Sequence, residues 1–299
     1  MGETELVQRI RALVQYKYRD RTLIQGIGDD CAIVRPAAGS DLVFTTDFVI
    51  EKRHFDLKTH NADDVGHKTL ARGLSDLAAM GSDPVFCLLS LAIPARLTTG
   101  WMDRFYQGFL ALADKCGVTL AGGDLSKSEI VVANVMCCGR VRKGKGILRS
   151  GAKPGDKIYV TGELGGSAYG FKIKRGKWWH RHLRPEPRIE AARGLRRLIS
   201  AGMDISDGLS VDLHRLCMES RVSADITSPL PIARGATLED ALHGGEDYEL
   251  LFTARPHQRI PPRVSSVPVT EIGRITRGSP GRVRLDGTEL RPGGFDHFR

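Results

Sequence analysis

The sequence lacks the features of membrane-spanning and exported proteins. None of its apolar runs approaches the roughly 20 residues that a membrane-spanning helix requires. The N-terminal residues MGETELVQRIRALV have helical apolar spacing but no small-residue cleavage site of the kind that ends a signal peptide. With 41% hydrophobic and 26% charged residues, the composition is that of a globular protein. We therefore expect a soluble protein located in the cytoplasm.

Two kinds of short motif are also missing. The cysteines show no CxxC or Cys/His spacing, which argues against a zinc site and favours reduced core residues; they are Cys31, Cys87, Cys116, Cys137, Cys138 and Cys217. The usual nucleotide motifs are absent as well: there is no GxxxxGK[ST], no GxGxxG before a helix and no kinase HRD or DFG. Any nucleotide site must therefore belong to another fold.

The net charge of +9 is concentrated in one segment. Residues 172–198 contain ten Lys or Arg against Glu186 and Glu190, which accounts for +8 of that charge: Lys172, Lys174, Arg175, Lys177, Arg181, Arg184, Arg188, Arg193, Arg196 and Arg197. Clustered cations beside Trp178, Trp179, His180 and His182 are compatible with a nucleic-acid binder. The alternative is a solvated, charged helical hairpin, which we favour because nucleic-acid binding leaves the acidic motifs below unused.

The length of 299 residues favours two domains of roughly 150 residues each. The Gly- and Lys-rich segment RKGKGILRSGAKPGD (142–156) indicates the boundary, so we expect domains at 1–146 and 147–299. Apolar periodicity predicts helices near 4–14, 63–80, 99–116 and 187–201, a helix opening at Ser206, and strands near 41–46, 85–92, 130–141, 157–161, 222–226 and 248–253. A Gly-rich turn is expected at 162–170. This mixture predicts a two-domain α/β (α+β) fold.

Five motifs place Asp beside Gly, Ser or Thr: GIGDD (26–30), TTD (45–47), SDLAAMG (75–81), GGD (122–124) and DISDG (204–208). Each alone is compatible with an ordinary turn or helix cap. Asp76 is more informative, because it lies about 145° around its predicted helix from the apolar side. Its own side carries Thr69, Gly73 and Met80, so the carboxylate points into a covered site where it is either paired or metal-bound.

Mg²⁺ takes hard oxygen ligands, commonly carboxylates together with substrate phosphates. TTD supplies hydroxyl, carbonyl and carboxylate oxygens from consecutive residues. If the aspartates of all five motifs share one site, their charge is too large for one ion. The motifs therefore favour several ions and a bound polyphosphate, which indicates a nucleotide.

The ordered motifs of the chain resemble those of the thiamine-monophosphate kinase family. They are GIGDDCAIV, TTDFVIEKRHFD, LSDLAAMGSDP, AGGDLS, RSGAKPGD, GELGGSAYG, GMDISDGLSVDL, HGGEDYELLFT and the terminal GFDHF. The resemblance runs from about residue 3 to the end. It implies membership of the superfamily of aminoimidazole ribonucleotide synthetase and selenophosphate synthetase, with an N-terminal mixed α/β domain for ATP, magnesium and dimerisation and a C-terminal α/β domain that completes the site. A homodimer with ATP sites near the subunit interface is also implied.

The resemblance implies transfer of the γ-phosphate of ATP directly to thiamine monophosphate, the last step of thiamine diphosphate synthesis. By motif position, several Mg²⁺ ions are assigned to Asp30, Thr45, Thr46, Asp47, Asp76, Asp124, Asp204 and Asp207. ATP is assigned to Tyr106, Gly123, Arg149 and Ser206. The thiamine substrate is assigned to His54, Glu246 and Phe295. No residue is expected to act as a general base, since the acceptor phosphate is already ionised at neutral pH.

Each carried-over residue also has an ordinary structural interpretation. Arg149 alone fits a solvated surface side chain, and His54 a hydrogen-bonded structural histidine. Ser206 and Asp207 fit an N-cap with free amides that favour anions. Glu246 fits a turn carboxylate, and Phe295 a packing anchor.

The sequence departs from the family pattern at a few positions. Leu125 replaces a usual Thr, and Lys52 and Arg53 replace smaller residues beside His54. Other enzymes of the superfamily and a catalytically inactive nucleotide sensor remain alternatives. Selenophosphate synthetase is disfavoured because no cysteine precedes Cys31.

Overall fold

The computed structural model describes residues 10, 12–13, 23–25, 33–97 and 99–295. Most of the predicted helix at 4–14, together with Asp30 and Cys31, lies outside these residues. The chain divides into two compact units, which are described separately. Unit 1 comprises Met1–Leu77 and Ser82–Lys145, and unit 2 comprises Ala78–Gly81 and Gly146–Arg299.

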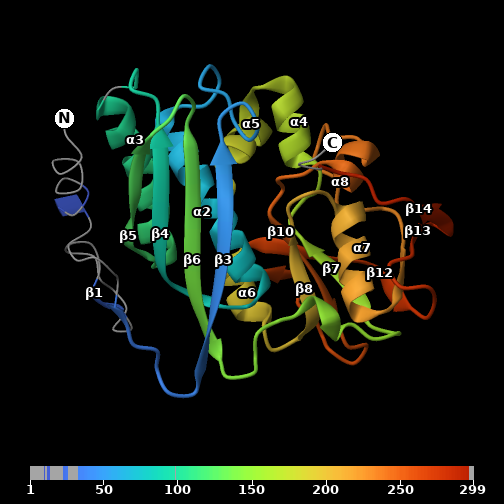
Figure 1. Cartoon of the computed structure of the whole chain (residues 1–299). Helices are drawn as coiled ribbons and strands as arrows, with labels where there is room; N and C mark the ends of the chain where they lie inside the picture. The colour runs from blue at the N-terminus through green and yellow to red at the C-terminus, as the bar shows by residue number, and fades with distance from the viewer. Residues whose placement is uncertain (1–9, 11, 14–22, 26–32, 98, 296–299) are drawn as a thin grey trace. The chain divides into compact units, whose positions relative to one another are not determined.

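Unit 1 contains a four-stranded sheet in the order β3-β6-β4-β5, with one parallel pair, β4 and β5. Its strands are β3 (Ser40–Ile50), β4 (Asp83–Ile93), β5 (Thr119–Lys127) and β6 (Val132–Arg142). Helices α2 (Ala62–Ala79) and α3 (Thr99–Cys116) cover the same face of this sheet (Figure 1). Two short strands, β1 (Leu23–Gln25) and β2 (Ile33–Val34), pair with each other.

Strand alternation gives the sheet of unit 1 two different faces. On β6, Val135 and Cys137 are fully buried beneath the helices. On β3, Phe44 and Phe48 point the other way and are 60% and 54% exposed. Side chains at odd-numbered positions of β3, such as Thr45, therefore point to the sheet face that α2 covers. Side chains at even-numbered positions point to the opposite face.

Unit 2 contains an eight-stranded, mainly antiparallel sheet in the order β14-β13-β9-β12-β7-β10-β8, with β11 paired to β12. Its strands are β7 (Lys157–Thr161), β8 (Ile199–Ile205), β9 (Ser223–Ile226), β10 (Glu249–Ala254), β11 (Arg263–Val264), β12 (Val267–Thr276), β13 (Val283–Leu285) and β14 (Thr288–Leu290). Its helices are η1 (Arg149–Gly151), α4 (Gly166–Ile173), α5 (Gly176–Leu183), α6 (Ile189–Leu195), α7 (Leu209–Ser220) and α8 (Leu238–His243). The core between α7 and the sheet includes Ile158, Leu213 and Leu251, all fully buried.

The predicted α/β fold class is confirmed, but several local predictions are wrong. The helix expected at 187–201 ends at Leu195, and its last residues begin strand β8. No Gly or Pro separates the two elements between Leu195 and Gly202, so apolar periodicity did not mark the change. The GGD motif lies inside β5 rather than on a turn, and the expected Gly-rich turn at 162–170 includes the start of α4.

Among the described helices, none is long and apolar enough to span a membrane.

The described cysteines are free thiols, as the sequence predicts. Cys87, Cys137, Cys138 and Cys217 are buried, and Cys116 is partly buried. Burial raises the pKa of the Cys217 thiol to about 12, so this group stays protonated and behaves as a core residue.

Candidate functional site

In unit 1, a glycine brings helix α2 against the sheet. A Cβ atom at Gly73 would lie 2.8 Å from the sulfur of Cys137 on β6, so no other residue fits this approach without displacement. The neighbouring positions of α2 then reach strand β3. The hydroxyl of Thr45 donates a hydrogen bond to the Asp76 carboxylate, and Arg72 Nη2 lies 3.5 Å from Asp47 Oδ1.

Thr45, Asp47 and Asp76 therefore come together on the covered face of the sheet, which agrees with the direction expected for Asp76. Their hydroxyl and carboxylate oxygens are the ligand type that Mg²⁺ prefers. The Arg72 contact is longer than an ordinary hydrogen bond but is within ion-pair distance of Asp47. The three side chains are thus chemically suited to bind a hard cation.

Two other predicted ligands of unit 1 lie elsewhere. Thr46 is exposed on the opposite face, where its hydroxyl accepts a hydrogen bond from Asn134 at 2.9 Å. Asp124 is exposed on β5 and pairs in register with Ser90. Asp30 lies outside the described residues. Within the described part of the chain, no three His, Cys, Asp or Glu side chains form a group able to hold a metal ion.

The two predicted ATP residues of unit 1 lie on α3 and β5. Tyr106 is 4% exposed and packs edge-to-face against Phe105 at 5.6 Å. Burial raises the pKa of its hydroxyl well above the ordinary value. Gly123 has φ 158°, and a Cβ there would lie 1.9 Å from the carbonyl oxygen of Leu89. The backbone at Gly123 thus excludes any side chain.

His54 lies in the turn that follows β3. The amide of Ile50 donates to His54 Nδ1 at 3.0 Å, and the buried Lys68 ammonium donates to the His54 carbonyl at 3.3 Å. Nδ1 accepts, so the proton of a neutral imidazole is on Nε2. His54 is therefore hydrogen-bonded through Nδ1 within its own turn, as expected for a structural histidine. The nearby departure from the family pattern, Lys52, occupies a left-handed turn position with φ 67°.

In unit 2, three distant sequence motifs meet in the loop after β8. The amide of Glu246 donates to the carbonyl of Ser206 at 2.8 Å, and that of Phe295 donates to the carbonyl of Asp207 at 3.2 Å. The glycine before each donor permits this approach, because a Cβ at Gly245 or Gly294 would lie only 2.7 or 2.3 Å from the same carbonyl oxygens. The structure thus brings together Ser206, Asp207, Glu246 and Phe295. Arg149 lies elsewhere, because its carbonyl accepts a hydrogen bond from Ser220 at the other end of α7. The Phe295 side chain is 40% exposed, so packing alone does not explain it.

A carboxylate that the sequence analysis did not single out organises this loop. Asp212 Oδ2 accepts hydrogen bonds from the amides of Ser206, Asp207 and Gly208 at 3.0–3.1 Å. Helix α7 begins at Leu209 rather than Ser206, so the expectation of free amides at Ser206 and Asp207 is wrong. Burial raises the pKa of Asp212 to about 6, against the opposing effect of the Asp207 amide.

Asp207 has a cationic partner on α7. Arg215 Nη1 lies 2.6 Å from Asp207 Oδ2 and 2.9 Å from Asp212 Oδ1. Asp212 and Arg215 are three residues apart on one helix, a spacing that signals such a pair in the sequence.

The two other predicted residues of unit 2 lie on β8 and η1. Asp204 lies on β8 opposite Leu250 and is 3% exposed. Arg149, at the start of η1, is exposed.

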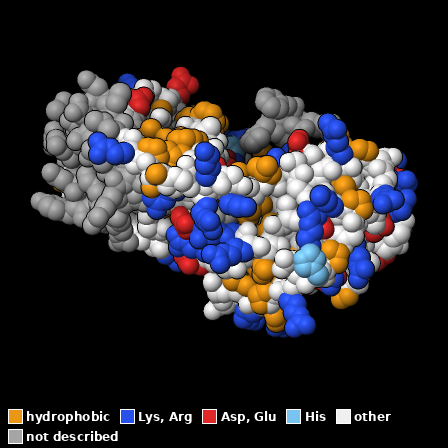
Figure 2. Space-filling model, turned by 90° about the horizontal axis from the view of Figure 1, so that it is seen from below, with side chains coloured by type: hydrophobic (Ala, Val, Ile, Leu, Met, Phe, Trp, Pro, Cys, Tyr) orange, Lys and Arg blue, Asp and Glu red, His pale blue; other side chains and the backbone are white. Residues whose placement is uncertain are grey.

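At least five of the ten cations of the basic segment pair with carboxylates of unit 2. Glu249 is 1% exposed and binds Arg181 at 2.7 Å and Arg188 Nε at 2.6 Å. Further partners of its cations are Asp240 for Lys172, Glu163 for Lys177, and Glu190 for Arg193. Figure 2 shows the opposite end of the molecule from α4 and α5, and there Lys and Arg side chains lie in several separate groups. These pairs support the interpretation as a charged helical structure.

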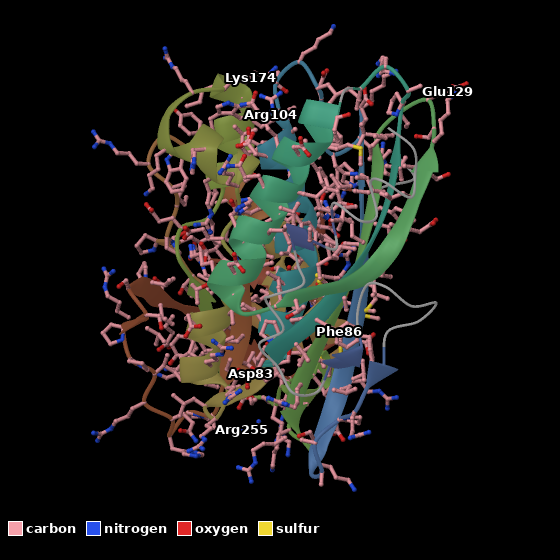
Figure 3. All side chains as sticks on the ribbon, turned by 90° about the vertical axis from the view of Figure 1, so that its left-hand side faces the viewer. Asp83, Phe86, Arg104, Glu129, Lys174 and Arg255 are labelled. Carbon is pink, nitrogen blue, oxygen red and sulfur yellow. The ribbon has the colours of Figure 1, made fainter. Side chains whose placement is uncertain are left out.

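A cavity of about 760 Å³ lies at the other end of unit 2's sheet, near the end of β10. Its lining includes Arg255 (labelled in Figure 3), Ser200 at the start of β8 and Ser220 at the end of α7. Asp204 lies near the last residue of β8, and Asp207 lies just before the first residue of α7, so both are far from this cavity. No predicted site residue lines this cavity, so it does not mark the candidate site.

Similarity to known proteins covers the whole chain. The family AIR synthase related protein matches through its N-terminal domain at residues 28–141 and its C-terminal domain at 153–286. Thiamine-monophosphate kinase of Haemophilus influenzae is 37% identical, over 100% of this chain and 98% of its own length.

Solved structures agree with these matches. Thiamine-monophosphate kinase from Stenotrophomonas maltophilia has a TM-score of 0.84 and 36% identity, covering 97% of this chain and 98% of its own. A relative solved in complex with AMPPCP and TMP has a TM-score of 0.80 and 32% identity, covering 99% and 97%. The chain therefore belongs to the thiamine-monophosphate kinase family of AIR synthase related proteins.

Proposed function

We propose that the chain phosphorylates thiamine monophosphate to thiamine diphosphate, with ATP as the phosphoryl donor. The observation that carries this proposal is the 37% identity to a thiamine-monophosphate kinase over the full length of both chains. A relative of 32% identity that was solved with AMPPCP and TMP gives independent support for both substrates. A cytoplasmic location goes with this biosynthetic role.

Magnesium is part of the proposal. We assign several Mg²⁺ ions to Asp30, Thr45, Thr46, Asp47, Asp76, Asp124, Asp204 and Asp207. Support comes from the oxygen donors that Thr45, Asp47 and Asp76 bring together on one face of the unit 1 sheet. When bound, Mg²⁺ supplies positive charge that offsets the repulsion between the phosphates.

The chain's own residues then bind and orient the two substrates. We assign ATP contacts to Tyr106, Gly123, Arg149 and Ser206, and thiamine contacts to His54, Glu246 and Phe295. The acceptor phosphate is largely ionised at neutral pH, so no side chain has to remove a proton from it. Catalysis rests on positioning and charge.

The direct test is to mix the purified protein with ATP, Mg²⁺ and thiamine monophosphate and to quantify thiamine diphosphate by chromatography. Product should form only with Mg²⁺ and only from the monophosphate. Thiamine and an aminoimidazole ribonucleotide precursor serve as control acceptors. A folded protein that makes no diphosphate would move the assignment to another reaction of the superfamily.

We also propose a homodimer. Phe44 and Phe48 are more than half exposed on the open face of β3, on either side of Thr46. Two large apolar side chains on one strand face favour burial against another protein surface, and a second copy of the chain fits the family. Sedimentation of wild type and of Phe44→Ser/Phe48→Ser should show a dimer and a monomer respectively. A wild-type monomer at micromolar concentration would contradict this proposal.

A further inference from the structure

Helix α5 carries a buried histidine that the proposed function has not used. His182 is 5% exposed, although its segment is the most basic of the chain. Its ring contacts Phe171 at 5.2 Å and stacks on Trp179 at 5.3 Å with an interplanar angle of 12°. These two rings hold the imidazole plane in one orientation.

The held ring directs one nitrogen at Glu246. His182 Nδ1 lies 2.9 Å from the hydroxyl of Ser167 and 3.5 Å from Glu246 Oε2. Ser167 is itself fixed, because it is fully buried and its amide donates to Asp247 Oδ1 at 3.0 Å. His182 Nδ1 therefore lies between a rigid part of α4 and the carboxylate assigned to the thiamine substrate, at hydrogen-bond distance from Ser167 and at ion-pair distance from Glu246.

Two arginines fix α5 and the segment that follows it on the sheet. Arg181 donates to the backbone carbonyl of Asp247 at 3.2 Å and to Glu249 at 2.7 Å. Arg188 binds the same carboxylate at 2.6 Å. Glu249 begins β10, three residues after Glu246, so the basic segment is attached to the strand that presents this carboxylate.

The backbone of Glu246 is constrained as well. It adopts φ 66°, a left-handed conformation that residues other than glycine rarely adopt. Its amide is bound to Ser206, and the amide of Tyr248 donates to Ile205 at 2.9 Å. With the backbone fixed at Ser206, the remaining freedom of Glu246 is in its side chain, where His182 acts.

We infer that His182 is a positioning residue that orients the Glu246 carboxylate toward the thiamine substrate. The inference rests on the proposed function. Thiamine carries a cationic thiazolium ring and an aminopyrimidine, and both favour a fixed carboxylate. The aromatic and basic residues of α5 thus stabilise a substrate contact rather than a nucleic-acid surface.

Steady-state kinetics of paired variants tests this role. His182→Asn keeps a polar group at the Nδ1 position, whereas His182→Gln places it at the Nε2 position. We expect His182→Gln and His182→Ala to raise the KM for thiamine monophosphate about tenfold, with the KM for ATP unchanged. His182→Asn should stay near wild type. His180→Ala, an exposed histidine on the same helix, is the matched control and should change neither KM.

A double variant separates orientation of Glu246 from general packing. If His182 acts through Glu246, adding His182→Ala to Glu246→Ala raises the KM no further. Equal rises in both KM values, or a lowered melting temperature with an unchanged KM for thiamine monophosphate, would overturn the inference. The Asn and Gln variants keep it testable should His182→Ala fail to fold. A wild type that does not phosphorylate thiamine monophosphate would instead refute the proposed function.

Discussion

The acidic residues of the two units have different hydrogen-bond and ion-pair partners. In unit 1, Asp47 and Asp76 contact a hydroxyl and an arginine that stays 3.5 Å away. In unit 2, Asp212 accepts three backbone amides and faces Arg215, and Glu249 is held by two arginines and the hydroxyl of Thr161. Most of the charge of the second group is thus balanced within the protein.

This difference separates two uses of a buried or partly buried carboxylate. A buried charge is expensive unless it is paired and hydrogen-bonded. Glu249 meets that requirement with protein groups and stabilises the fold. Asp47 and Asp76 lie on the same sheet face as the Thr45 hydroxyl, and such oxygen donors can also bind a cation from solution. Substitutions of Asp47 and Asp76 should therefore reduce activity, and substitution of Glu249 should reduce stability.

The largest effect is expected at Asp76. Asp76→Asn keeps the size of the side chain but removes a charge assigned to magnesium, so kcat should fall about 100- to 1000-fold. Asp47→Asn should behave alike, and neither should lower the denaturation midpoint appreciably. Glu129→Gln is the control, since Glu129 is exposed in the turn between β5 and β6 (Figure 3). Wild-type turnover in either Asp variant would remove the basis of the metal assignment.

Glu249→Gln should mainly lower stability, in contrast to the loss of kcat expected at Asp76. The change removes the buried carboxylate that the mostly buried Arg181 and Arg188 share, which should lower the free energy of unfolding by about 3–5 kcal/mol. Urea denaturation measures this loss. Glu271→Gln is the matched control, because Glu271 pairs with Lys157 at 2.8 Å but is 37% exposed, and its loss should stay below about 1 kcal/mol. Equal losses in the two variants would contradict the distinction between the units.

Residues of the candidate site differ in how far the sequence could predict them. Asp76 was predictable because 3.6-residue periodicity places it on a small, covered side of a helix. The β8 loop could be found only as separate motifs, since Ser206, Glu246 and Phe295 meet through backbone bonds between distant segments. Asp212 looked like an ordinary helix acid, because amides that precede a helix leave no side-chain pattern. The basic segment looked exposed because Glu249 lies 68 and 61 positions along the chain from Arg181 and Arg188.

The pH dependence of stability should report the buried acids of unit 2. Burial, opposed by the amides of Ser167 and Gly165, raises the pKa of Asp247 from 3.8 to about 7. The folded state therefore binds a proton that the unfolded state releases above about pH 4. This contribution to stability is complete below pH 4 and is lost as pH rises through 7, by up to about 4 kcal/mol.

Asp247→Asn has no proton to lose, so its unfolding free energy should fall less steeply between pH 4 and 7. Denaturation of both proteins across that range measures the slope, which is independent of the absolute stability of the variant. Asp225→Asn, at a partly exposed acid of β9, should keep the wild-type slope. Parallel curves for wild type and Asp247→Asn would show that Asp247 is ionised in the folded state throughout.

The smallest effect is expected at the cap of α8, where unit 2 uses one more acid for structure. Thr237 accepts the amide of Asp240 at 3.1 Å, and the Asp240 carboxylate accepts the amide of Thr237 at 3.0 Å. Thr237→Ala removes half of this reciprocal cap and should cost about 1 kcal/mol of unfolding free energy. Because α8 ends at His243, shortly before Glu246, a change confined to the cap should leave kcat and both KM values unaltered. A raised KM for thiamine monophosphate in Thr237→Ala would mean that the acids of unit 2 also shape the substrate site, and the contrast with unit 1 would then have to be redrawn around Glu246.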